Sequence, residues 1–224
     1  DQELHQIDVW DDHLYVTDTA HNRVLAYQIT SGGLKYARAY YPKGPLTDGR
    51  QSPNYAHINS VFRCGEQIYL MYHNYTRRTG RASQIAVLNL NWEEVHISET
   101  SADSAHNVFC DGAGVIYCDS IHGRLMRGDR TLFEESVYLR GLAVADDFYL
   151  IGGSEFAKRD ERGNTTGHLY QWDFNTETLL TEVCIPGAGS AYEVRLYKKP
   201  DFGMRQFSKS IQRQRPVRVA EKLN

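Results

Sequence analysis

The chain has 224 residues, of which 41% are hydrophobic and 24% are charged, and its formal net charge is −3. No stretch approaches the roughly 20 consecutive apolar residues that a membrane-spanning helix needs, and the slightly acidic balance gives no overall basic field for nucleic acid. We therefore expect a globular protein whose partners are neither membranes nor nucleic acids.

Four segments repeat one pattern along the chain. Each begins with a polar residue and an apolar strand, turns at Asp or Gly, and returns in a strand built around a tyrosine. In chain order they read HQIDVWDDHLYVTDTAHNRVLAY (5–27), NSVFRCGEQIYLMYHNY (59–75), HNVFCDGAGVIYCDSIHGRLM (106–126) and RGLAVADDFYLIGGSE (140–155). Self-similarity at about 35–55 residues with short strands is typical of the blades of a β-propeller.

Alternating apolar and polar residues extend this pattern into further strands. We predict an all-β propeller with four-stranded antiparallel blades at 5–41, 57–98, 106–136 and 140–185. A fifth blade starts at Tyr192 (YEVRLY), so the predicted count is five, with six as the alternative. Residues 1–202 form the propeller. Residues 203–224 hold six Lys or Arg against one acidic residue, and they are predicted to be a basic tail, a closing strand or an extension.

Strand direction predicts where the histidines lie. Because antiparallel strands alternate in direction, the start of each innermost strand and the turn between the second and third strands share one face. Six of the nine histidines fall at such places, while His13 falls in the first turn, on the opposite face. The predicted shared face contains His5, His21, His57, Asn59, His73, His106, Asn107, His122, Arg140, Tyr192 and Glu193.

Some of these residues have a structural explanation. The turns DTAHNR and DSIHGR resemble a common blade turn in which Asp and Asn satisfy backbone groups. His21 and His122 are therefore expected to be structural, and Asp18 and Asp119 are expected to hold these turns. The sequence does not decide between a functional and a structural role for His5, His73, Asn107 or Arg140, and Glu193 can also pair with Arg195.

The remaining groups suit three chemistries. A divalent metal could be held by His57, His106 and Glu193, with His5 as a further ligand. A histidine could act as a general base while Arg140 neutralises a developing anion. Alternatively, these groups bind a ligand without catalysing a reaction, and Arg140 forms paired hydrogen bonds with its carboxylate or phosphate. The predicted catalytic residues are His57, His106, Arg140 and Glu193, and the predicted substrate-binding residues are Asn59, His73, Asn107 and Tyr192.

The segment DVWDDHLYVTDTAHNRVLAY is similar to the NHL repeat. The similarity is good over 7–29, fair over 106–126 and loose in the second and fourth repeats. The whole chain resembles the propeller superfamily that includes NHL, gluconolactonase-like, strictosidine-synthase-like and virginiamycin B lyase-type proteins. The motifs HINS, AHNV, RGLA, GGSE and YEVR resemble a bacterial branch of it.

The resemblance implies a propeller fold but little about function, since this fold hosts hydrolases, lyases, synthases and binding modules. Gluconolactonase-like members hold a divalent ion with Glu, Asn and Asp, roles that Glu193, Asn59 and Asn107 could take. The surplus of histidine and the lack of a matching Asp favour a transition metal over calcium.

The hypothesis from the sequence is a site that acts on a small polar or sugar-like compound by metal-assisted hydrolysis or elimination. The alternative is a non-catalytic module that binds a protein or a glycan. The four cysteines show no CxxC spacing and are expected to be buried free thiols, which fits a reducing compartment and a cytoplasmic location.

Overall fold

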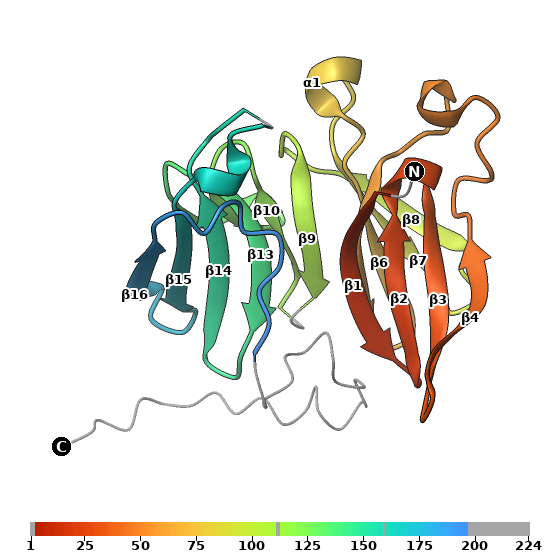
Figure 1. Cartoon of the computed structure of the whole chain (residues 1–224), viewed down its shortest axis with the longest axis horizontal. Helices are drawn as coiled ribbons and strands as arrows, with labels where there is room; N and C mark the ends of the chain where they lie inside the picture. The colour runs from red at the N-terminus through yellow and green to blue at the C-terminus, as the bar shows by residue number, and fades with distance from the viewer. Residues whose placement is uncertain (1–2, 111–112, 159, 197–224) are drawn as a thin grey trace.

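The computed structural model describes residues 3–110, 113–158 and 160–196. These residues form four antiparallel sheets of four strands each (Figure 1). In each sheet the strands follow one another in chain order, from the innermost strand to the outermost. The first blade comprises β1 (Leu4–Trp10), β2 (His13–Asp18), β3 (Arg23–Thr30) and β4 (Gly33–Tyr40). The second comprises β5 (Ile58–Cys64), β6 (Gln67–Tyr72), β7 (Gln84–Leu88) and β8 (Glu94–Glu99).

The third blade comprises β9 (Ala105–Cys110), β10 (Val115–Asp119), β11 (Arg124–Arg127) and β12 (Arg130–Glu134). The fourth comprises β13 (Tyr138–Val144), β14 (Phe148–Ser154), β15 (Gly167–Asp173) and β16 (Thr178–Ile185). Four one-turn helices interrupt the loops: η1 (Thr19–His21), η2 (Gly49–Gln51), α1 (Thr76–Thr79) and η3 (Arg162–Asn164). The predicted all-β propeller with four-stranded antiparallel blades is confirmed, and no helix in the described ranges has the length and apolarity to cross a bilayer.

The predicted count of five or six blades is wrong, because the described residues form four blades. Residues 190–196, where a fifth blade was expected to start, contain no strand. Val194 packs into the space left by the missing side chains of Gly141 and Gly152. The segment therefore lies along the fourth blade, beside β13, instead of opening a new sheet (Figure 1). The basic segment 203–224 lies outside the described residues.

Burial falls from the inner strands outward. Every residue of β9 is buried, whereas every residue of β16 is exposed. Aromatic side chains fill the space between blades, which is how neighbouring sheets bury their apolar faces. The rings of Tyr40 and Trp92 stack at 3.8 Å between the first and second blades, and those of Phe133 and Tyr170 lie 5.0 Å apart between the third and fourth.

Buried amide side chains join consecutive inner strands. Asn59 Nδ2 donates to the carbonyl oxygen of Ala105 at 2.8 Å, which links the second blade to the third. The amide N–H of Gly141 donates to Asn107 Oδ1 at 2.8 Å, which links the third blade to the fourth. Since a buried polar group must find a partner, these bonds fix how one blade follows the next.

The long loops gather at one end of the molecule. The start of β1, η2, α1 and η3 all lie at the upper end in Figure 1. The turn between β1 and β2, which includes His13 at its edge, lies at the lower end, as the alternation of strand direction predicted. All four cysteines are free thiols; three are buried as expected, but Cys184 is exposed.

Candidate functional site

Four imidazole rings meet at the upper end of the propeller. They come from the start of β1 (His5), the residue before β5 (His57), the residue after β6 (His73) and β9 (His106). The ring centroids lie 5.3 Å apart for His5–His57, 4.6 Å for His57–His73, 5.2 Å for His73–His106 and 6.1 Å for His106–His5. Three separate blades therefore contribute to one group of four rings, each in contact with two others. We call these four residues the histidine cluster.

His21 and His122 lie outside this cluster. Their Nδ1 atoms contact Asp18 and Asp119 at 2.9 and 2.8 Å, and their side chains are 45% and 47% exposed. Each pair closes the turn after the second strand of its blade. This geometry agrees with the structural role that the turn sequences predicted.

Hydrogen bonds indicate the tautomers of two cluster histidines. His106 Nδ1 lies 2.8 Å from the carbonyl oxygen of Ser104, which can only accept, so Nδ1 carries the hydrogen and Nε2 has the free lone pair. The backbone N–H of Tyr75 donates to His73 Nδ1 at 3.0 Å, so the hydrogen of His73 sits on Nε2. The cluster thus contains a hydrogen-bond acceptor, His106 Nε2, and a hydrogen-bond donor, His73 Nε2, on neighbouring rings.

The cluster is uncharged at neutral pH. Burial is the main cause that lowers the pKa of each of the four imidazoles, to about 3 for His5 and about 4 for His73. The pKa values of His57 and His106 are also well below the ordinary value, for the same reason. The positive charge of Arg140 opposes protonation of every ring.

The backbone around the cluster is strained. His57, Asn74, Tyr75 and Asn107 have φ values of 52°, 58°, 50° and 56°, in the left-handed region. This conformation costs about 1–2 kcal/mol per residue for most side chains, and less for asparagine, whose side chain can form local hydrogen bonds. Such strain persists where the surrounding structure fixes it, and it is concentrated at functional sites.

Arg140 is a buried cation next to the cluster. Arg140 belongs to β13 and is only 9% exposed. This burial lowers the pKa of its guanidinium. Its Nη2 atom lies 3.3 Å from His5 Nδ1, and its guanidinium carbon lies 4.5 Å from the centre of the Tyr192 ring. Among the described residues, no carboxylate oxygen lies within 4.0 Å of this guanidinium; Glu193 is instead 3.2 Å from Arg195.

A cavity of about 450 Å³ opens beside Arg140, and residues 155–158 and 161–162 also line it. Tyr138 joins it to the histidine cluster, since its ring lies 6.0 Å from His106 and 6.1 Å from Phe156. Positive charge predominates on the walls. The lining contains four cations, Arg77, Arg140, Lys158 and Arg162, two carboxylates, Glu155 and Glu161, and three aromatic residues, Tyr138, Phe156 and Tyr192.

The predicted site residues are thus only partly brought together. His57, His73 and His106 belong to the cluster, and Arg140 and Tyr192 line the cavity. The amides of Asn59 and Asn107 are used in bonds between blades. Their roles in substrate binding stay predictions, and so do the catalytic roles.

The donor atoms predicted to hold a metal are not gathered in one place among the described residues. Among the described residues, the potential ligands that form a trio within 4.8 Å of one another are His168, Glu182 and Cys184, in the fourth blade. The donor atoms of His57, His106 and Glu193 do not form such a trio. A divalent metal at the upper end stays a prediction without a matching set of donors.

Sequence reasoning missed two tyrosines of the site. Tyr55 donates or accepts a 3.1 Å hydrogen bond at His57 Nδ1, and Tyr138 borders both the cluster and the cavity. Each precedes a singled-out residue, His57 or Arg140, by two positions. The spacing of two was the available signal, although His57 has a left-handed φ of 52°, so the alternation of an extended chain does not explain the Tyr55 contact.

No protein-family model matches the chain, and no curated protein matches its sequence. Among solved structures, a putative 6-phosphogluconolactonase from Bacteroides uniformis is similar, with a TM-score of 0.48 and 10% identity over 82% of this chain and 58% of that one. Drosophila Semaphorin 1a, extracellular domains 1–2, has a TM-score of 0.48 and 10% identity over 76% of this chain and 38% of that one. Drosophila Plexin A, in complex with Semaphorin 1b, has a TM-score of 0.48 and 12% identity over 83% of this chain and 42% of that one.

The chain therefore spans less than two thirds of each of these structures. Likeness at this level carries no conclusion about activity, and the resemblance to NHL and gluconolactonase-like proteins stays a prediction. The fold assignment rests on the four blades themselves: this chain is a β-propeller of four-stranded antiparallel blades.

Proposed function

We propose that the upper end of the propeller binds a small, polar, sugar-like ligand through a carboxylate or phosphate group held by Arg140. The observation that carries this proposal is the burial of Arg140 beside a cavity with no carboxylate of the described residues within 4.0 Å. A buried cation with no carboxylate at ion-pairing distance is costly, and Glu193 acts on Arg140 only through longer-range attraction. An anionic ligand would supply a close counter-charge, and the planar guanidinium suits two parallel hydrogen bonds.

The rest of the cavity suits the rest of such a ligand. The faces of Tyr138, Phe156 and Tyr192 offer apolar surface to a carbon skeleton, while Glu155 and Glu161 can accept hydrogen bonds from hydroxyl groups. Lys158 and Arg162 add positive charge near the opening. This combination favours an anionic sugar-like compound over an apolar one.

The histidine cluster adds chemistry next to the bound anion. His106 can accept a hydrogen bond at the free lone pair of Nε2. Because burial lowers its pKa well below the ordinary value, it is a weak base at neutral pH. The proposed reaction class, hydrolysis or elimination, therefore depends on Arg140 stabilising negative charge that develops on the ligand. No step is assigned to a metal, because the donor atoms there do not converge.

The test measures binding to wild type and to Arg140→Gln. The probes are glucose 6-phosphate and glucuronate, with uncharged glucose as the control compound and Arg38→Gln on exposed β4 as the matched control variant. Arg140→Gln should lose at least about tenfold in affinity for the anionic probes, since a hydrogen bond to a charged group contributes about 1.5–3 kcal/mol. Arg38→Gln should bind as wild type does.

Equal binding of glucose and the two anions, or unchanged affinity in Arg140→Gln, would contradict the proposal. Anion binding that depends on Arg140 but gives no product with any lactone or ester of these sugars would favour the alternative, a non-catalytic binding module. Arg140→Gln should remain folded, because it removes a buried charge that lacks an acidic partner.

A further inference from the structure

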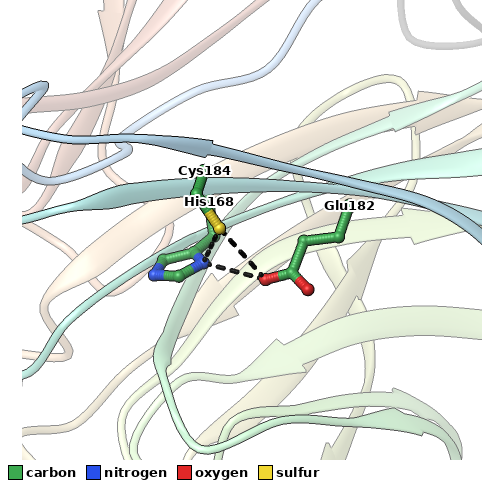
Figure 2. Close-up of side chains that lie close together, drawn as sticks. All are labelled: His168, Glu182 and Cys184. Atoms are coloured by element: carbon green, nitrogen blue, oxygen red, sulfur yellow. Dashed lines mark hydrogen bonds and ion pairs between the residues drawn. The ribbon is translucent and has the colours of Figure 1, made fainter.

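A second group of reactive side chains lies on the outer half of the fourth blade, away from the cavity. His168 is in β15, and Glu182 and Cys184 are in the edge strand β16. His168 and Cys184 are direct cross-strand partners, and Glu182 is two residues before Cys184. All three side chains therefore lie on the same face of the sheet, as Figure 2 shows.

The three donor atoms are close together. His168 Nδ1 lies 3.1 Å from Glu182 Oε1 and 3.5 Å from Cys184 Sγ, and Sγ lies 3.5 Å from the same carboxylate oxygen (Figure 2). In a tetrahedral zinc site, with Zn–S near 2.3 Å and Zn–N and Zn–O near 2.0–2.1 Å, donor atoms are about 3.3–3.6 Å apart. The observed triangle has almost these dimensions.

We propose that His168, Glu182 and Cys184 bind a divalent transition-metal ion, with Zn²⁺ as the best fit. Thiolate sulfur and imidazole nitrogen select such ions over Mg²⁺ and Ca²⁺, which prefer oxygen ligands. On binding, the thiol loses its proton to solvent and the sulfur forms the metal bond. Three protein ligands leave a fourth position for water or for a donor atom of another molecule.

The site also has a mechanical consequence. All residues of β16 are exposed, and this strand is the free edge of its sheet among the described residues. A metal ion held by both strands would tie β16 to β15 at one point. The site is independent of the proposed ligand at Arg140, so either can fail without the other.

The test uses the untagged full chain after treatment with a chelator. Cobalt(II) serves as the probe, because a thiolate ligand gives a charge-transfer band and tetrahedral geometry gives strong visible bands; zinc is then added in competition. We expect one equivalent to bind and zinc to displace it. Cys184→Ser should abolish the charge-transfer band, and His168→Gln and Glu182→Gln should each weaken binding by at least about tenfold.

Two controls separate this site from others. His96→Gln, at an exposed position of β8, should bind metal as wild type does, and His73→Gln tests the histidine cluster. Because the other three cysteines are buried, Cys184 should react first with a thiol reagent, and zinc should protect it. Tight binding that persists in Cys184→Ser, or binding that His73→Gln abolishes, would overturn the proposal, as would a cobalt spectrum with no thiolate band.

Discussion

The guanidinium of Arg140 lies 3.3 Å from Nδ1 of His5, although the two residues are 135 positions apart in the chain. Arg140 can only donate, so His5 accepts, and this ring nitrogen must be unprotonated. The contact bridges the fourth blade and the first. Because the positive charge of Arg140 lowers the pKa of His5, the contact also links this cation of the cavity wall to the protonation of the histidine cluster.

The first prediction concerns acid. The folded-state pKa values of His5 and His73, about 3 and about 4, lie below the unfolded value of 6.5. Between these values the unfolded chain binds more protons, so the free energy of unfolding falls as pH drops below about 6.5, by up to about 1.4 kcal/mol per pH unit for each such histidine. Denaturant unfolding at several pH values measures the slope, and His73→Gln should reduce it. A slope that is equal in both proteins would refute the assignment of a buried neutral His73.

The second prediction concerns the bonds between blades. Asn107→Ala removes the acceptor for the Gly141 N–H and places Ala at a φ of 56°. A buried donor left without its partner costs about 1–3 kcal/mol, so unfolding should need correspondingly less denaturant. Asn175→Ala, at an exposed turn, is the control and should change stability by less than about 0.5 kcal/mol. If both variants unfold alike, the Asn107 bond does not stabilise the propeller.

The third prediction concerns the turn DSIHGR. Gly123 has a φ of 65°, and a Cβ there would overlap the carbonyl oxygen of Glu135. Gly123→Ala should therefore destabilise the protein by at least about 1–2 kcal/mol. Gly163→Ala has open space around it and no left-handed backbone, so it should be close to neutral. Melting temperatures of the two variants check this; a Gly123→Ala protein as stable as the Gly163→Ala protein would contradict the turn geometry.

The fourth prediction separates buried from exposed cations at the cavity. Lys158 is exposed, so Lys158→Gln should weaken glucose 6-phosphate binding at low salt, and the difference should shrink as salt rises. The loss in Arg140→Gln should persist at high salt, because a buried charge is screened less. Titrations at two salt concentrations test this. The same salt dependence for both variants would mean that the anion does not reach Arg140.

Much of the fold was predictable because each blade is a local unit. The repeat around Tyr15, Tyr69, Tyr117 and Tyr149 predicted the strands of these four blades, since period-2 alternation and turn residues act within a few positions of the chain. The fifth blade that was also predicted is absent from the described residues. The shared end of the histidines followed from strand direction alone. The roles of Asp18 and Asp119 followed from the turn sequences.

What the sequence by itself determined was the blade, its strands and the end of the molecule at which each side chain emerges. The tertiary structure decided the number of blades, because Val194 finds its place against Gly141 and Gly152 of distant strands. It also decided which histidines meet and that Arg140 is buried without an acidic partner among the described residues. The pairing of His168 with Cys184 depended likewise on the register between β15 and β16. The meeting of the histidines and the burial of Arg140 depend on packing between segments far apart in the chain, and the His168–Cys184 pairing depends on strand register. Local patterns of polarity do not determine either.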